Sequence, residues 1–484
     1  MSMSSALNNA VSGLTASSRM AEIISSNTAN AMTEGYARRE LSLSSETLGG
    51  DGGGVRILGV NRVVNESLLQ DRRIADAEAA NTTARTDFYS RFESALGDPE
   101  TQGSLSSLMS ELEGSLIEAA SMPDSTARLT TAVNAAGNVA DKLNTIADDL
   151  QQVRLDADHS IADQVSTLND TLQKIEVLNR TITSEISVGN DAAGLMDQRQ
   201  ALVDRIAEIV PVRTVARDNN QIALYTTGGA ILLDGSASEV GFTQSGVMNA
   251  DMTIESGALS GLTLNGHPIS SSDDGAFGGG TLGAAFAVRD ELAPAAQEQL
   301  DAVARNLIER FADPSVDSTL ASGDAGLFTD GGGAFDPANE TGLAGRIQIN
   351  AIVDPAQGGE VWHLRDGIGA TSEGAVGDAS LLNALSGALS EAFTPASGGF
   401  GSALRSASGL VADLLSSASA KRQSSELDQS YAVARQETLT ELTLADGVDT
   451  DYEMQMLLKV QQAYAANAKV ITAIDEMMQR VLEM

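Results

Sequence analysis

Histidine, the side chain that most often moves protons near neutral pH, occurs only three times in the 484 residues of this chain. His159, His267 and His363 lie far apart in the sequence, and none belongs to the H-E-x-x-H pattern that places two zinc ligands on one helix face. Cysteine is absent, so the chain has no thiolate nucleophile, no thiolate metal ligand and no disulfide. We therefore expect neither a catalytic nor a metal-binding site and interpret the histidines as incidental.

One glycine motif could hold a phosphate group. Gly278, Gly280 and Gly283 match G-x-G-x-x-G, which binds a dinucleotide when a strand precedes it and a helix follows it within a βαβ unit. The residues before the motif, 270–275, are typical of a loop. We expect no cofactor there.

Acidic side chains could bind calcium or hydrolyse glycosides. Asp273, Asp274 and the loop from Asp324 to Asp336 lack the alternating ligand spacing and the closing glutamate of a calcium loop. The 66 acidic residues allow many carboxylate pairs, and nothing in the sequence distinguishes one pair as catalytic. The sequence thus predicts that the chain is not an enzyme.

The charge of the chain excludes two classes of partner. The formal net charge is −36, which repels both nucleic acid and anionic membrane surfaces. No stretch approaches the roughly 20 apolar residues of a membrane helix, so we expect no membrane insertion. Arg19 and Glu22 are the only charged residues among the first 30, without the basic start and apolar run of a secretory signal. If the protein leaves the cell, we expect it not to use the general secretory route.

The first 34 residues predict one amphipathic helix. Apolar and small residues recur there at alternating spacings of four and three, the pattern of a coiled-coil seam. Gly35 is the expected helix stop because glycine tolerates the left-handed conformation. The seam comprises Met3, Leu7, Ala10, Leu14, Ser17, Ala21, Ile24, Thr28 and Ala31.

The last 34 residues predict a second helix with a stronger seam. The charged residues from Lys459 onward all lie off this seam. Thr450 and Glu453 have the spacing of a capping box, which marks the expected helix start. The seam comprises Leu457, Val460, Tyr464, Asn467, Ile471, Ile474, Met478 and Val481.

Between the ends, the pattern predicts a mainly α fold with inserted β segments. Residues 36–65 alternate like a hairpin, 66–210 are helical with two apolar stripes (139–153 and 161–175), and 211–281 read as short strands. We expect three domains. They are a terminal coiled-coil pair (1–35 with 448–484), a discontinuous long-helix domain (36–312 with 376–447) and a β-rich outer domain (313–375).

The terminal helices are expected to be only marginally stable without contacts to other segments or subunits. The large apolar members of the first seam contribute roughly 6–12 kcal/mol on burial, whereas ordering each residue costs about 1–2 kcal/mol of backbone entropy. We therefore expect both ends to be mobile in the monomer and to become ordered on assembly. A stable two-helix stalk without an assembly role fits the periodicity equally well.

Both ends of the chain resemble one protein superfamily. Ser5 to Leu14 read SALNNAVSGL and Ser26 to Arg39 read SNTANAMTEGYARR. They are similar to the N-terminal signature of bacterial flagellar axial proteins, an SGL segment followed by an N-x-A-N run and a Gly-aromatic pair. Val460 to Asp475, VQQAYAANAKVITAID, resembles the matching C-terminal signature.

The middle of the chain narrows this resemblance to the flagellar hook-associated protein 1 family. The run DAAGLMDQRQALVD (Asp191 to Asp204) and the run GGTLGAAFAVRDEL, which begins at Gly279, resemble helices of that family, and so does the segment Tyr36 to Arg39. One residue departs from the pattern. Glu34 replaces the usual proline before the Gly-aromatic pair, which leaves the end of the first helix to Gly35 alone.

The resemblance implies a structural subunit at the junction between hook and filament. It implies unfolded export through the flagellar type III channel with a chaperone on the C-terminal helix, a secreted location on the flagellum, and a helical ring of copies. The hook protein and hook-associated protein 3 would be its neighbours. The assembly residues would be those of the C-terminal seam together with Leu7, Leu14, Ile24, Asn27, Asn30, Gly35 and Tyr36.

Two alternatives remain open. The chain could be another axial component, a hook or rod protein, although its long helical insert and the DQR run at 197–199 favour the junction protein. Residues 313–375 could instead carry a glycan-binding or enzymatic module displayed on the flagellum, for which Trp362, Phe328 and Phe335 are the available aromatic residues.

Overall fold

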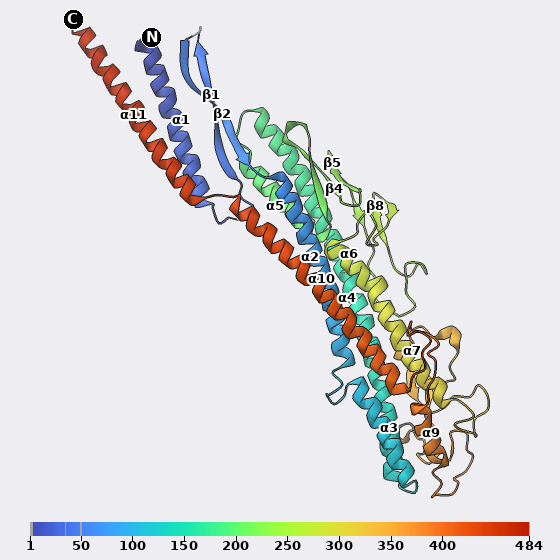
Figure 1. Cartoon of the computed structure of the whole chain (residues 1–484). Helices are drawn as coiled ribbons and strands as arrows, with labels where there is room; N and C mark the ends of the chain where they lie inside the picture. Colours follow the sequence, from blue (N-terminus) through green and yellow to red (C-terminus); the bar gives the residue numbers. More distant parts are fainter. Residues whose placement is uncertain (1–2, 34, 49–50, 484) are drawn as a thin grey trace.

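The chain is elongated, with both ends of the chain at the same tip of the molecule (Figure 1). The computed structural model describes residues 3–33, 35–48 and 51–483. Long helices dominate, as expected, and small antiparallel sheets lie beside them. The principal helices are α1 (Met3–Ala29), α2 (Glu66–Leu96), α3 (Leu105–Ser121), α4 (Thr126–Ser187), α5 (Ala193–Ile209), α6 (Gly280–Ala287), α7 (Ala293–Phe311), α8 (His363–Asp366), α9 (Ser380–Ser390), α10 (Ala407–Ala445) and α11 (Thr450–Leu482).

Helix α4 is the spine of the molecule. It has 62 residues and is therefore about 90 Å long. The two apolar stripes predicted over 139–153 and 161–175 both lie on this one helix. Each stripe is buried, and each enters a different hydrophobic core.

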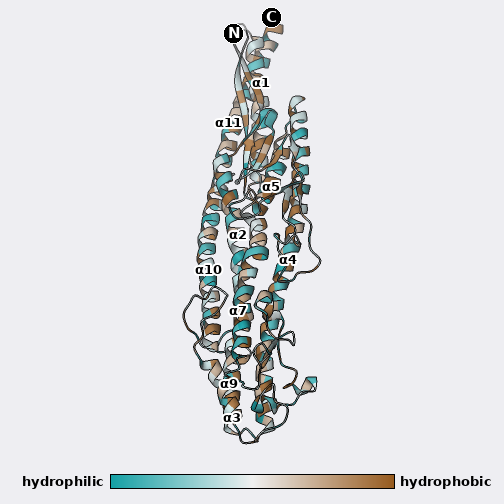
Figure 2. Cartoon of the chain, turned by 90° about the vertical axis from the view of Figure 1, so that its right-hand side faces the viewer, coloured by the Kyte–Doolittle hydropathy of each residue, from teal (hydrophilic) through white to brown (hydrophobic). Residues whose placement is uncertain are grey.

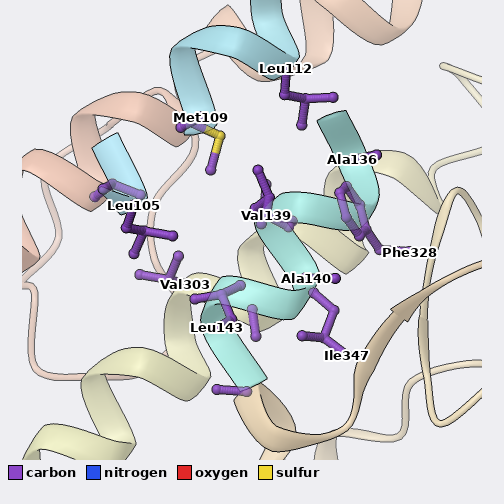
Figure 3. Packing of buried hydrophobic residues seen from close by; sticks show 14 of the residues in the cluster. Leu105, Met109, Leu112, Ala136, Val139, Ala140, Leu143, Val303, Phe328 and Ile347 are labelled. Atoms are coloured by element: carbon purple, nitrogen blue, oxygen red, sulfur yellow. The ribbon is translucent and has the colours of Figure 1, made fainter. Parts of the chain in front are cut away.

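The first core surrounds the stripe from Val139 to Val153. It combines this part of α4 with α3, α7, α9 and the start of α10. Figure 3 shows Leu105 and Met109 of α3 directed toward Val139 and Leu143 of α4. Figure 2 shows hydrophobic and hydrophilic residues alternating along these helices.

The second core surrounds the stripe from Ile161 to Ile175. It combines α4 with α5, α6 and the strands between residues 212 and 269. These strands confirm the short β segments predicted over 211–281. They form a four-stranded sheet of β3 (Val212–Ala216), β4 (Ile222–Thr226), β5 (Ile231–Asp234) and β6 (Ser236–Ala237), and a three-stranded sheet of β7 (Val240–Gly241), β8 (Leu262–Leu264) and β9 (His267–Ile269).

A buried polar layer separates the two cores. Asp158 of α4 is fully buried and accepts a hydrogen bond of 2.7 Å from the Arg289 guanidinium, which is also fully buried. Arg289 lies in a π-helical turn (Val288–Leu292) that joins α6 to α7. One helical turn away, the buried Arg154 donates to the backbone oxygens of Arg289, Asn249 and Met252. This layer fixes α4 against both α7 and the loop before β8.

The hairpin predicted over 36–65 is present. Strands β1 (Arg38–Leu48) and β2 (Asp51–Val63) pair in antiparallel register from Arg38 opposite Val63, with irregularities after Ser42 and after Glu46. The hairpin lies against α1 near the tip of the molecule (Figure 1). A two-stranded sheet is only marginally stable alone, so α1 provides the surface that it needs.

Residues 313–375 contain less β structure than the sequence predicted. Their only described strands are β10 (Phe328–Asp330) and β11 (Ile347–Ile349), with short 3₁₀ turns and α8 around them. Aspartates cap the turns, as Asp336 does for Ala338 and Asp354 does for Ala356. The apolar residues of this segment join the first core. The expected three-domain division of the chain stays a prediction.

Asp301 holds this segment against α7. Its carboxylate is buried and accepts hydrogen bonds from the backbone N–H groups of Gly342 and Ala344 and from the Gln297 amide, at 2.7–2.8 Å. Burial raises the pKa of Asp301 from 3.8 to about 6, although these donors favour the ionised form.

We predict that Asp301 makes the protein more stable as the pH falls toward 4. Because the folded state binds this proton more tightly than the unfolded chain, stability rises as the pH decreases through about 6 and levels off below about 4. The shift of about two pKa units corresponds to about 3 kcal/mol. In urea unfolding, the free energy of unfolding of the native protein minus that of Asp301→Asn should increase by about 3 kcal/mol from pH 7 to pH 4, because only the native protein gains this proton. A difference that is independent of pH would contradict this assignment.

We also predict that Asp158→Ala destabilises the protein by about 3–5 kcal/mol, because it leaves the Arg289 charge buried with less compensation. Asp156→Ala is the matched control, since Asp156 lies two residues earlier on α4 in an exposed pair with Arg91 at 3.4 Å. That pair should contribute less than about 1 kcal/mol. Equal losses in urea unfolding for the two variants would show that the polar layer does not hold the cores together.

Candidate functional site: the terminal helix pair

The two terminal helices lie side by side at the tip of the molecule, and they are covered unequally (Figure 1). Helix α1 lies between α11 and the β1–β2 hairpin. Helix α11 has α1 on one side, and most of its remaining surface faces solvent. The sequence predicted this pairing of the ends, and the contacts between α1 and α11 confirm it.

The seam of α1 faces its neighbours. Ala10, Ser17 and Ile24 are buried, and Leu7 and Leu14 are partly buried. Further residues outside this seam, such as Ala16 and Ile23, are also buried, because the hairpin covers a second side of the helix. The contacts of α1 therefore extend beyond the stripe that the heptad pattern identified.

The seam of α11 is only partly covered. Val460 and Ile474 are buried, and Leu457, Asn467 and Ile471 are partly buried. The other three predicted members are exposed in the single chain: Tyr464 by 45%, Met478 by 46% and Val481 by 63%. The structure thus brings five of the eight seam residues toward α1.

Gly13 and Asn467 mark the closest approach of the two helices. A Cβ atom added at Gly13 would lie 2.7 Å from the Asn467 side-chain nitrogen, so a larger residue there would displace the Asn467 amide. Glycine within a helix costs about 1 kcal/mol relative to alanine. The absence of a side chain at Gly13 leaves room for the Asn467 amide between the two helices.

Asn27 connects three segments at the base of the pair. Its side chain is buried, donates to the Arg39 backbone oxygen at 2.9 Å and to Glu453 Oε1 at 3.0 Å, and accepts from the Tyr36 hydroxyl at 2.9 Å and from the Arg39 backbone N–H at 3.0 Å. One amide side chain therefore holds the end of α1, the start of β1 and the first turn of α11 together.

Glu453 has a different role from the one predicted. The cap of α11 is Asp449, whose carboxylate accepts from the backbone N–H groups of Asp451 and Tyr452, so the Thr450–Glu453 capping box is wrong by one residue. Glu453 is buried instead against Asn27, and Arg38 lies 3.7 Å from its carboxylate. The start of α11 was predicted correctly, but its first glutamate serves the contact between the ends of the chain.

Helix α1 ends at Ala29, five residues before the predicted end at residue 34. The Asn30 side chain donates to the Ser26 backbone oxygen, and the chain then turns so that Tyr36 reaches Asn27. Gly35 has a φ of +76°, the left-handed conformation expected of it. The predicted effect of Glu34 on the helix end lies outside the described residues.

Asp197 connects this base to the helical body. Its carboxylate accepts from the guanidinium groups of Arg39 at 3.1 Å and Arg62 at 2.9 Å, and from the backbone N–H of Ala37 at 3.3 Å. The DQR run at 197–199 resembles a family signature in the sequence, but the sequence predicted no contact for it. The signal that could have identified Asp197 is the presence of a carboxylate in a motif together with arginines in the hairpin.

Arg199, the last residue of that run, lies deeper. It is buried and donates to the Asn179 side-chain oxygen at 2.8 Å and the Asn220 backbone oxygen at 2.7 Å. Burial is the main cause that lowers the pKa of the Arg199 guanidinium to about 10. It fixes the end of α4 to α5 and to the turn before β4.

The residues first considered for chemistry are dispersed. His159 lies on α4, His267 on β9 and His363 on α8, and the described part of the chain contains no cluster of three or more candidate metal ligands. Gly278 and Gly280 allow close backbone contacts, since an added Cβ at Gly280 would lie 2.3 Å from the Ile209 backbone oxygen. No helix among the described residues has the length and apolar character needed to cross a membrane.

Two family models match this chain. The model of the flagellar hook-associated protein FlgK helical domain matches residues 89–327, and the model of the flagellar basal body rod FlgEFG protein C-terminal region matches residues 445–484. The first match contains α3, α4, α5 and α7, and the second contains α11.

Several curated proteins are similar to the chain. Flagellar hook-associated protein 1 of Bacillus subtilis (strain 168) is 24% identical over 94% of this chain and 93% of that protein. Its counterpart in Salmonella typhimurium is 28% identical, but over 49% of this chain and 44% of the relative. A solved structure of the flagellar hook junction protein FlgK from Burkholderia pseudomallei aligns with a TM-score of 0.45 and 20% identity over 54% of this chain and 47% of that one. The family models and the full-length relative show that the chain belongs to the flagellar hook-associated protein 1 family and is a structural protein of the bacterial flagellum.

Proposed function

We propose that this chain forms the junction between hook and filament, where copies assemble into a helical ring through the terminal helix pair, residues 1–35 with 448–484. The observation that carries the proposal is the incomplete cover of α11 in the single chain. Met454, Leu458, Met477 and Val481 are each about half exposed or more. Burying such side chains contributes roughly 1.5–3 kcal/mol each, which favours contact with further subunits.

The pattern of α11 supports a helix with two contact surfaces. Beside the seam that faces α1, a second row recurs every seven residues: Met456, Ala463, Val470 and Met477. Three of these four residues are exposed, and none is charged. A helix with two adjacent apolar rows can pair with α1 on one side and with a neighbouring copy on the other.

The exposed surface of α11 also supports proposals about the export of the chain and about its partner proteins. We propose that the chain is exported unfolded through the flagellar type III channel and that a chaperone covers α11 before assembly, because this surface would otherwise promote aggregation. The absence of cysteine suits a protein that passes between redox compartments. In the assembled flagellum, its neighbours would be the hook protein on one side and hook-associated protein 3 on the other.

A structural role accounts for the site better than catalysis. The polar groups at the base of the terminal pair bond to one another, so they serve packing rather than a reaction. In residues 313–375, Phe328 is buried in the first core and does not form a glycan-binding surface. The helical-domain match over 89–327 favours the junction protein over a hook or rod protein.

Deletion of Met454 to Met484 tests this function. The two cores contain no residue of α11, so the truncated chain should keep the unfolding midpoint of its helical body. It should be absent from purified flagella, because the assembly surface is lost. Normal filaments and motility in cells that produce only the truncated chain would refute the proposal.

Asn27→Ala tests whether the terminal pair acts as one unit. The change removes an amide that donates two hydrogen bonds and accepts two, and it leaves the buried Glu453 without its Asn27 donor, at an expected cost of about 2–4 kcal/mol. In assembled flagella, amide hydrogen exchange over residues 3–29 should become at least about tenfold faster than in the native chain. Asn8→Ala, at an exposed position of the same helix, is the control and should have no such effect.

Equal exchange in the two variants would mean that Asn27 does not hold the pair. Protection of residues 3–29 in the unmodified monomer answers a separate question. Strong protection there would contradict our expectation that the ends become ordered only on assembly.

A further inference from the structure

Helix α10 carries apolar residues on two opposite faces. On its inner face, Leu410, Val411 and Leu414 belong to the first core. On its outer face, apolar and small polar residues recur at spacings of three and four, the pattern of a coiled-coil seam, and all of them are exposed and uncharged. This outer row comprises Ala420, Ser424, Leu427, Tyr431, Ala434, Thr438, Leu442 and Ala445. Its large members face solvent in the single chain, with Leu427 exposed by 68%, Tyr431 by 72% and Leu442 by 51%.

The last turns of α4 carry a second exposed row with the same spacing. Val177 is exposed by 54% and Val188 by 70%, on the side of α4 opposite the fully buried Ile175 and Ile182. No member of the row is charged, and all except the half-buried Thr181 are exposed. The row comprises Gln173, Val177, Thr181, Ser184 and Val188. The second core uses the opposite face of α4, so this row is left open to solvent.

The two rows lie on opposite sides of the body. Figure 2 shows α10 along one edge of the molecule and α4 along the other, with α2 between them. Both helices run from the far end of the molecule toward the terminal pair (Figure 1). A ring of identical subunits needs two different surfaces of this kind, because each copy contacts one neighbour with one surface and the other neighbour with the second.

We propose that the outer row of α10 packs against the exposed row of α4 in the neighbouring copy of the ring. This inference rests on the proposed function and adds a lateral contact between helical bodies to the contact through the terminal pair. Neighbouring copies in one turn of a ring point in the same direction, so the two helices are parallel and their side chains interdigitate as in a coiled coil. One contact of this kind, repeated around the ring, covers both rows of every copy.

Hydrogen bonds across the body show which residues of the two rows lie at the same height. They join Gln436 of α10 to Asp76 of α2, Arg72 of α2 to Asp204 of α5, and Arg199 of α5 to Asn179 of α4, at 3.1, 2.6 and 2.8 Å. Following these bonds along the helices places Asn179 about 14 Å nearer the terminal pair than Gln436. Val177 is then about 10 Å and Leu442 about 9 Å nearer the terminal pair than Gln436. Neighbours in one turn of a ring keep nearly the same height, so Leu442 of one copy meets Val177 of the next.

The size of the contact explains why it needs a neighbour that the terminal pair already holds. The row of α4 is about 24 Å long and a helix is about 10 Å wide, so the contact buries about 500 Å² over both copies, well below the roughly 1,200 Å² of a stable interface. Beyond Ala445, α11 continues along the same edge of the molecule (Figures 1 and 2). Its first turns expose Met454 by 51% and Leu458 by 56%. The outer row of α10 therefore prolongs the exposed surface of α11, and the same neighbour covers both.

The absence of cysteine allows a direct test by crosslinking. Flagella are purified from cells that produce only the variant Val177→Cys with Leu442→Cys, treated with a short bis-maleimide and analysed on a denaturing gel. We expect a ladder of dimers and larger species, because each copy offers one cysteine to each neighbour. The two single variants should remain monomeric. The control pair Ile231→Cys with Leu442→Cys should also remain monomeric, because Ile231 is exposed by 47% but lies on strand β5, outside both rows.

Charge variants test the contact without crosslinking. Leu442→Glu places a carboxylate in the apolar contact and should reduce the amount of the chain in purified flagella by about tenfold or more. The unfolding midpoint should remain that of the native protein, because Leu442 is exposed in the single chain. A second change, Val177→Lys, should restore assembly of Leu442→Glu by pairing with the new carboxylate. Ile231→Glu is the matched control and should assemble normally.

Three outcomes would overturn the inference. Flagella that contain the double-cysteine chain without crosslinks would show that the two rows do not meet. Dimers of Leu442→Cys alone would show that α10 packs against α10 instead of α4. Normal assembly of Leu442→Glu would show that its row is not buried in the ring. In each case, native chain in the same flagella leaves the proposed function standing, whereas its absence from purified hook and filament structures refutes that function as well.

Discussion

The arrangement at the tip depends on the buried side chain of Asn27. Its amide nitrogen donates two hydrogen bonds and its oxygen accepts two, and these bonds join the end of α1 to the start of β1 and the first turn of α11. An apolar seam alone permits a helix to slide by a turn at little cost, whereas a buried amide that loses its partners pays the full desolvation penalty. The close contact between Gly13 and Asn467 is consistent with the same register about four turns further along the pair.

In the helical body, buried charged side chains fix the register of the helices. Helix α4 contributes to two apolar cores, and either core by itself would tolerate small shifts along such a long helix. The buried layer of Arg154, Asp158 and Arg289 lies between them and does not tolerate a shift, because a displaced guanidinium would be left without acceptors. Asp197 extends this connection to the hairpin. The orientation of the terminal pair is thereby coupled to the long axis of the body.

The spacing of apolar residues in the sequence identified the structural features that depend on local pattern. The two seams, the hairpin and the stripes of α4 follow from spacing alone. The hairpin and the stripes lie where the sequence predicted, whereas Tyr464, Met478 and Val481 of the C-terminal seam are exposed in the single chain. What the pattern missed depends on contacts between distant residues. Helix α1 stops at Ala29 because the following turn must return Tyr36 to Asn27, and Glu453 leaves its predicted capping role because Asn27 and Arg38 lie beside it. Residues 313–375 form turns in place of strands because aspartates satisfy the backbone locally, which a count of glycines and β-branched residues does not reveal.

The negative charge of the chain restricts association between copies to uncharged surfaces such as those of the terminal helix pair. Copies with a net charge of −36 repel one another over distances of about a Debye length, roughly 8–10 Å, so most approaches between them are unfavourable. Contact is favourable only where charge is absent. On α11, the seam beyond Glu453 and the row Met456, Ala463, Val470 and Met477 carry no charge. The same acidity that keeps the separate subunits apart therefore directs their association to these surfaces at the terminal pair.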